Sequence, residues 1–215
     1  AILAAMLLPA LKNAKESANS TLCRSNLRQS GLAASAYASD NNNLFYESYG
    51  YSGWTPPLIQ NNYLSAAPAT AVCPSEKPYV YSNSNATYGA GYRVHENMTG
   101  SIPAEDKPFP ILSRAFTYGA TSGTEYLRNT NMIRKTEKYV LLLDTWSSWT
   151  LVQMNDPQAT GTNVYAYPAL RHSRTCNAVF WDFHVESMGS EELKDRRWAS
   201  AYMGAAGMYI GPNPL

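Results

Sequence analysis

The sequence has little charge and few cysteines. Only 15% of its 215 residues are charged, and 17 basic residues nearly balance 16 acidic ones, which leaves a formal net charge of +1. This balance excludes the strongly basic surface with which many proteins bind nucleic acid. Three cysteines are too few for a disulfide scaffold, and they lack the spacing of a metal finger. The hydrophobic content of 45% excludes a disordered chain, so we expect a folded domain with its own core.

Short motifs of the common enzyme classes are also absent. The sequence contains no Gly-x-Ser-x-Gly nucleophile elbow, no phosphate-binding loop ending in Gly-Lys-Ser/Thr and no His-Glu-x-x-His pair. Gly89 and Gly91 lie close together, but no strand-to-helix unit surrounds them, so they do not indicate a nucleotide site. We therefore predict that the protein is not an enzyme and has no cofactor.

The three cysteines allow at most one intrachain disulfide. Their positions do not choose among the three pairings, and we take Cys23 and Cys73 as the candidate pair. Cys73 precedes a proline in a loop-like stretch, so we expect it to be accessible. Cys176 could act as a nucleophile with His172 as its base, but a cysteine beside an aromatic strand more often packs in a core.

The first eleven residues contain no polar side chain, so a helix there would have no face for water. A membrane span needs about 20 such residues. We therefore expect this segment to be the end of a longer apolar segment that has lost its first part, although a buried N-terminal helix is the alternative. Its stem-forming residues are Ile2, Leu3, Met6, Leu7, Leu8, Pro9 and Leu11.

Helical character continues well beyond this segment. Small and helix-forming residues extend to Tyr37, and Asp40 with three following asparagines should end the helix. Pro9 should kink the helix or break one of its hydrogen bonds. The pattern thus predicts one helix of roughly 35 to 38 residues. Residues at helical spacing form an apolar stripe: Leu7, Leu11, Ala14, Ala18, Leu22 and Ser25.

Strand patterns appear in the second half of the chain. Residues 138–143 form an apolar run that suits a central, doubly buried strand, and residues 177–186 alternate as a half-buried strand does. Residues 146–154 are a weaker strand candidate. We predict an α+β protein, with a helical stem at 1–40 packed on a mainly antiparallel sheet in a head at 41–215. Two short helices, at 58–64 and 191–201, and surface loops, at 81–87 and 102–110, complete the prediction.

The densest polar cluster in the sequence surrounds the alternating segment. It consists of His172, Asp182, His184 and Glu186. We expect a structural hydrogen bond between His172 and Asp182 across a hairpin, with the other side chains on the surface. Histidine and carboxylate are also metal ligands, so a metal site of His172, Asp182 and His184 is the alternative.

Two motifs carry a resemblance to a known family. The run Ala1–Leu11 with Cys23-Arg-Ser-Asn-Leu-Arg-Gln29 resembles the start of bacterial type IV pilin-like proteins, the pseudopilins. His172, nine residues and Asp182 resemble the H-X9-DG element of prepilin-type processing-associated proteins. Further similarity lies, in the family's order, in Tyr37–Asp40, Val72-Cys-Pro-Ser75, Tyr88-Gly89 and Leu141-Leu-Leu-Asp144. In this resemblance His172, Asp182 and Asp144 form a structural motif. Phe183 stands where the element has glycine, which favours a continued strand over a tight turn.

The resemblance implies a non-enzymatic pseudopilin subunit of a cell-envelope filament or type II secretion-like system. Its partners would be like subunits and the secretion machinery, with no nucleic acid. Its N-terminal segment would hold it in the inner membrane with the head in the periplasm, or in an envelope filament. One alternative is an envelope-anchored glycan-binding module, with Tyr49, Tyr51 and Trp54 stacking on sugars. The other is a metal-dependent hydrolase built on His172, Asp182 and His184.

Overall fold

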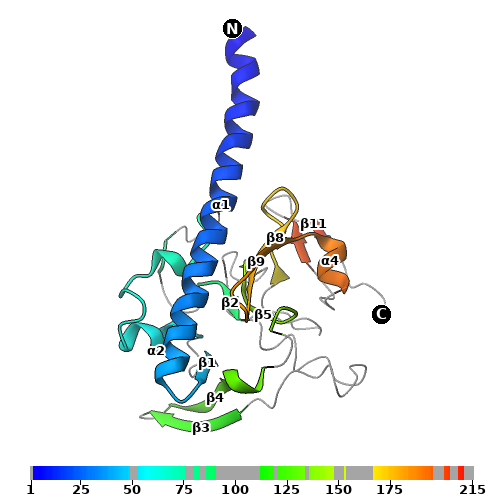
Figure 1. The fold of residues 1–215 in the computed structure, drawn as a ribbon. Helices are drawn as coiled ribbons and strands as arrows, with labels where there is room; N and C mark the ends of the chain where they lie inside the picture. The colour runs from blue at the N-terminus through cyan, green and yellow to red at the C-terminus, as the bar shows by residue number, and fades with distance from the viewer. Residues whose placement is uncertain are drawn as a thin grey trace.

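The fold of the protein is given by a computed structural model (Figure 1). It describes residues 2–48, 53–75, 80–82, 86–90, 112–118, 121–133, 136–147, 153, 167–195, 201–203 and 208–210. Within these ranges only the backbone is described for residues 2–6, 47–48, 90, 112–118, 121–126, 194, 201–203 and 208–210.

The N-terminal helix dominates the molecule. α1 (Ile2–Asp40) has 39 residues and runs through Pro9 without a break. Figure 1 shows its N-terminal part standing clear of the head, which surrounds the other end of the helix. The helix ends where predicted because Asn42 and Asn43 adopt left-handed backbone angles, with φ of 56° and 60°, which asparagine tolerates. Among the described residues, no helix has an apolar stretch long enough to cross a membrane.

The face of α1 that packs on the head differs from the stripe expected from the sequence. Cys23, Leu27, Ala34, Tyr37 and Ala38 are buried in the core. The stripe named from the sequence is exposed from Leu7 to Ser25. At 3.6 residues per turn, the buried residues lie on the side of the helix roughly opposite the stripe, and they include the large side chains of Leu27 and Tyr37.

α1 packs against the middle of the central sheet of the head. Its strands follow the order β2 (Gly89–Ala90), β5 (Val140–Leu143), β8 (Cys176–Phe180) and β9 (Val185–Met188), and all neighbours are antiparallel. The helix packs on one face of this sheet, while α4 (Ser190–Asp195) belongs to the core on the other face. β5 is buried along its whole length, which confirms the expected central strand.

Gly31 lets α1 approach the sheet closely. A Cβ atom at this position would lie 3.1 Å from Cγ2 of Val179 and 3.6 Å from Cδ2 of Leu141. Both contacts are with side chains of the central strands, so a larger residue would push helix and sheet apart.

The expected strand at 177–186 is instead a hairpin. β8 ends at Phe180, the chain turns, and β9 begins at Val185. Phe183 occupies the turn with a φ of 66°, a left-handed angle that favours glycine. Its amide donates to the carbonyl of Phe180 at 2.9 Å. A tight turn therefore forms here without a glycine, and the prediction of a continued strand was wrong.

The remaining elements lie around this sheet. A second antiparallel sheet has the order β1 (Leu44–Ser48), β4 (Thr121–Asn129) and β3 (Leu112–Tyr118). Shorter elements are α2 (Thr55–Gln60), η1 (Ala69–Ala71), η3 (Thr130–Met132), β6 (Thr145–Trp146), β7 (Tyr167–Pro168), β10 (Ala201–Met203) and β11 (Met208–Ile210). The long helix over antiparallel sheets confirms the α+β class.

Several predicted boundaries shift in the structure. The helix expected at 58–64 starts at Thr55 because prolines occupy its first turn, where their missing amide hydrogens cost nothing. The strand expected at 146–154 is described only as the short β6, and the helix expected at 191–201 is described only as far as Asp195. The loop predicted at 102–110 lies outside the described residues.

Candidate functional site

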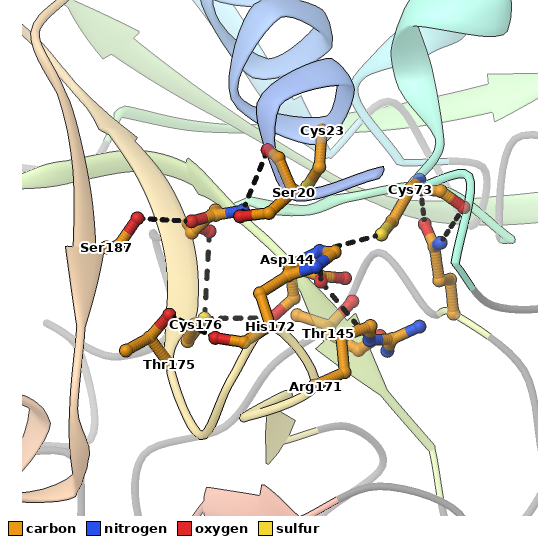
Figure 2. A network of polar contacts seen from close by, with 12 residues as sticks. Ser20, Cys23, Cys73, Asp144, Thr145, Arg171, His172, Thr175, Cys176 and Ser187 are labelled. Atoms are coloured by element: carbon orange, nitrogen blue, oxygen red, sulfur yellow. Dashed lines mark hydrogen bonds and ion pairs between the residues drawn. The ribbon is translucent and has the colours of Figure 1, made fainter. Parts of the chain in front are cut away.

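Four buried side chains of different segments converge between α1 and the head. Cys23, Cys73, Asp144 and His172 each offer one sulfur, nitrogen or oxygen atom, and these four atoms all lie within 4.8 Å of one another. Figure 2 shows that the side chain of Cys23 on the helix and that of Cys73 on a separate loop both point toward Asp144 and His172. Each of the four residues is at most 1% exposed. We call these four residues the buried cluster.

His172 is held by a tight two-residue hairpin. Its amide donates to the carbonyl of Thr175 at 3.2 Å, and the amide of Thr175 donates back at 3.0 Å. The two residues between them, Ser173 and Arg174, both have positive φ, the geometry of a type I′ turn. The turn directs the imidazole into the head, where Nε2 lies 3.2 Å from Sγ of Cys73.

Asp144 lies directly after β5, where the central strand ends. Its Oδ2 is 3.4 Å from Nε2 of His172 and 3.2 Å from Nε of Arg171. Arg171 is fixed in turn, because its guanidinium donates to the carbonyl of Thr145 at 2.7 Å. Neither carboxylate oxygen of Asp144 accepts a well-formed hydrogen bond from the described residues. The buried carboxylate of Asp144 is thus stabilised by the nearby charges of Arg171 and His172 and not by hydrogen bonds from the described residues. Burying a carboxylate in this way costs free energy unless further ligands bind it.

Cys73 is positioned by its backbone. Gln153 accepts from the amide of Cys73 at 3.0 Å and donates to its carbonyl at 2.9 Å. The helix holds the preceding loop, since Asn26 donates to the carbonyl of Val72 at 3.1 Å and Ser30 to that of Thr70 at 2.8 Å. Cys73 is fully buried, so the expectation of an accessible thiol was wrong. The polar contacts with α1 draw the loop inward, and burial raises the pKa of the Cys73 thiol well above its usual value.

Cys23 brings the helix into the cluster. The hydroxyl of Tyr88, itself buried, lies 3.4 Å from Sγ of Cys23 and 3.3 Å from its carbonyl oxygen. Burial raises the pKa of Tyr88, which keeps this hydroxyl a hydrogen-bond donor. Cys23 and Cys73 are thus brought together as the candidate disulfide requires, but both are free thiols in this structure.

Glu16 completes the surroundings of His172. Its Oε1 lies 2.9 Å from Nδ1 of the imidazole, on the side opposite the cluster. Burial lowers the pKa of His172, but the contacts with Asp144 and Cys73 outweigh it and raise the pKa to about 10. Both ring nitrogens of His172 thus have a partner. Nε2 contacts Cys73 and Asp144 in the buried cluster, and Nδ1 contacts Glu16 of the helix.

The polar set predicted around Asp182 is not assembled as expected. Asp182 contacts His184, whose Nδ1 lies 2.5 Å from Oδ1 of the carboxylate, and Glu186 lies 3.8 Å from the other ring nitrogen. The exposed fractions of the three side chains are 34% for Asp182, 40% for His184 and 33% for Glu186. His172 has other partners, so both the predicted His172–Asp182 hydrogen bond and the metal set of His172, Asp182 and His184 were wrong. The hairpin turn separates residues that a continuous strand would have aligned.

Other candidate residues have structural surroundings. Trp54 is completely buried, and its indole nitrogen donates to the carbonyl of Tyr88 at 2.9 Å, so it offers no platform for a sugar. Tyr49 and Tyr51 lie outside the described residues. Cys176 is buried in the core, with Sγ 3.2 Å from the carbonyl of Asp144. Burial raises the pKa of Cys176, which is consistent with packing and not with a reactive thiolate.

The chemistry open to the buried cluster is limited by its burial. A thiol, an imidazole and a carboxylate in contact also occur in cysteine hydrolases, but a substrate cannot reach a sulfur that has no exposed surface. Two possibilities remain for the buried cluster: the thiols of Cys23 and Cys73 are oxidised to a disulfide, or the cluster binds a metal ion.

Sequence reasoning singled out each residue of the buried cluster separately but did not place them together. It missed Glu16, Arg171 and Gln153 as their supporting partners. One signal was available, because all four cluster residues lie within the segments that carry the family resemblance. No family model, curated protein or solved structure matches this chain.

Proposed function

We propose that the protein is a non-enzymatic, pilin-like subunit whose stem helix α1 assembles with the stem helices of like subunits in the bacterial cell envelope. The observation that carries the proposal is the projecting segment of α1, residues 2–15. Leu7, Leu8 and Leu11 are 67%, 68% and 68% exposed. A helix that exposes large apolar side chains so far from its own core suits burial against another helix or in lipid.

The exposed side of α1 favours close contact with other helices. Below the leucines, Ala14, Ala18 and Leu22 continue the same stripe, and all three are exposed. Small residues let helix backbones approach one another, which is how helices associate when surrounded by apolar groups. The stripe thus supports helix-to-helix assembly, while roughly the opposite face of α1 packs on the head.

The size of the exposed surface predicts weak association between two free subunits. Burying the exposed parts of the three leucines contributes about 3–6 kcal/mol per chain. Association of two molecules costs roughly 4–15 kcal/mol in lost freedom. Pairing should therefore be weak and concentration-dependent, whereas a bundle in which each stem contacts several others would be stable.

Sedimentation velocity over a range of concentrations tests this proposal. We expect the chain to form oligomers as its concentration rises, and the double variant Leu7→Gln/Leu11→Gln to remain monomeric. Leu32→Gln and Val80→Gln are matched controls, because these residues are 50% and 64% exposed away from the projecting segment. The controls should associate as the unchanged chain does.

Two outcomes would contradict the proposal. One is a chain that stays monomeric at high concentration. The other is association that the control variants abolish as effectively as the stem variant. Location gives an independent test in cells that produce the natural protein: the head should be accessible to protease from the periplasmic side, and a cytoplasmic head would exclude a pilin-like role.

A further inference from the structure

The spacing of the buried cluster matches the coordination sphere of one small metal ion. With bonds of about 2.3 Å to sulfur and about 2.0 Å to nitrogen or oxygen, a tetrahedral zinc ion separates sulfur from nitrogen by about 3.5 Å and nitrogen from oxygen by about 3.3 Å. Sγ of Cys73 and Nε2 of His172 are 3.2 Å apart, and this nitrogen is 3.4 Å from Oδ2 of Asp144. Sγ of Cys23 completes the set within 4.8 Å.

The groups around these four side chains are those that support metal ligands. A metal-bound histidine usually donates its second ring nitrogen to a carboxylate, which fixes the ring and its tautomer. Glu16 is placed to accept from Nδ1 of His172, so that Nε2 would bind a metal ion through its lone pair once the ion replaces the proton on that nitrogen. Arg171 holds the Asp144 carboxylate from outside, and the hydroxyl of Tyr88 contacts the sulfur of Cys23.

Oxidation of the two thiols explains less of this arrangement. A disulfide would use Cys23 and Cys73 but would leave Asp144 buried with no hydrogen bond to either oxygen. It would also give His172 no reason to lie against a sulfur atom. A metal ion uses all four side chains and gives the buried carboxylate a direct ligand bond in place of the hydrogen bonds that the described residues do not supply.

We propose that Cys23, Cys73, Asp144 and His172 bind one zinc ion that fixes the stem helix to the head. Two thiolates, an imidazole and a carboxylate suit zinc, whereas magnesium and calcium prefer oxygen ligands. Four protein ligands leave no position for water or substrate, so the ion is structural and not catalytic. Because the ligands come from α1, the loop after η1, the end of β5 and the hairpin at His172, the ion connects four separate segments.

Metal analysis of the reduced protein tests the proposal directly. The chain is purified with a thiol reductant, stripped with a chelator, incubated with zinc and desalted. We expect one zinc per chain by mass spectrometry. Cobalt, used as a spectroscopic substitute for zinc, should give the charge-transfer absorption of thiolate ligands and the visible bands of a tetrahedral ion. Zinc should also raise the unfolding temperature of the stripped chain.

Four ligand variants are compared with three control variants of the same residue types. The ligand variants are Cys23→Ser, Cys73→Ser, His172→Gln and Asp144→Asn, and the controls are Cys176→Ser, His184→Gln and Asp182→Asn. We expect the affinity for zinc to fall at least tenfold in each ligand variant and to stay within twofold in the controls. Circular dichroism at low temperature shows which variants keep the fold, and only those are compared.

The unchanged chain decides the question even where variants fail to fold. A reduced, folded chain that binds no zinc and gives no cobalt spectrum would overturn the proposal. So would zinc binding that is lost in His184→Gln or Asp182→Asn but kept in the ligand variants. A Cys23–Cys73 disulfide that forms in the presence of saturating zinc, and stabilises the fold more than zinc does, would assign the two thiols to a crosslink instead.

Discussion

Oε1 of Glu16 lies 2.9 Å from Nδ1 of His172, which connects the first half-buried residue described in α1 to a hairpin more than 150 residues further along the chain. Glu16 is the point at which the helix passes from its exposed part into the head, since the residues described before it are exposed. This contact therefore lies at the point along α1 where packing against the head begins.

Loss of this contact should weaken the head's hold on the helix. Glu16→Gln removes the charge that pairs with the imidazole while keeping the size of the side chain. The Glu16 side chain is 35% exposed, so we expect a loss of only about 1 kcal/mol in the free energy of unfolding. Denaturant unfolding measures it. Glu137→Gln, an exposed carboxylate before β5, should change the stability by less than about 0.5 kcal/mol.

Asp144 and Asp182 should differ sharply in their importance for stability. Asp144→Asn removes the buried carboxylate charge that faces both Arg171 and His172, which should cost about 3–5 kcal/mol. Asp182→Asn changes a side chain that is 34% exposed and should cost less than about 1 kcal/mol. Thermal unfolding of the two variants side by side gives the order. Equal losses of stability in the two variants would mean that burial of Asp144 beside Arg171 does not make this carboxylate more important for stability than an exposed one.

The turn at Phe183 predicts an unusual order of two substitutions. Both Phe183→Ala and Phe183→Gly lose the contacts of the ring with the core, but only glycine adopts a φ of 66° without strain. We expect the glycine variant to be more stable than the alanine variant by about 1 kcal/mol. At Val185, inside β9, the order should reverse, with alanine more stable than glycine. Chemical denaturation of all four variants checks both pairs.

The close approach at Gly31 predicts a cost for any larger residue. Gly31→Val places its Cβ 3.1 Å from Val179 and its methyl groups closer still, and overpacking of this kind costs about 1–3 kcal/mol. Ala36→Val, on the exposed side of the same helix, should cost only about 0.5 kcal/mol from helix propensity. A Gly31→Val variant as stable as the unchanged chain would show that helix and sheet can separate freely.

The features that could be predicted from the sequence are those that depend on local residue patterns. The length of α1 follows from continuous helix-forming residues and the asparagines after Asp40, and the buried run of β5 marks a central strand. The α+β class follows from these two elements together. Each depends on neighbours in the chain, which a reader of the sequence can see.

The features that could not be predicted depend on distant residues. Alternation from Asn177 to Glu186 continues through a turn, so periodicity alone does not reveal that Phe183 reverses the chain. The partner of His172 is likewise not the aspartate that follows it but Asp144, which the packing of the central sheet places beside it. The buried face of α1 includes Gly31, whose close fit against the sheet no helical pattern records.

The polar contacts between α1 and the head also determine how the molecule would respond to force. Asn26 and Ser30 hold the loop before Cys73, and Glu16 holds His172, so several attachments are spread along the helix. A pull on the projecting end of α1, directed along its axis, would load these attachments in shear and nearly together. Peeling the helix away sideways would break them one after another. The helix and the head should therefore stay together far longer under a pull along the helix axis than when the helix is bent away from the head.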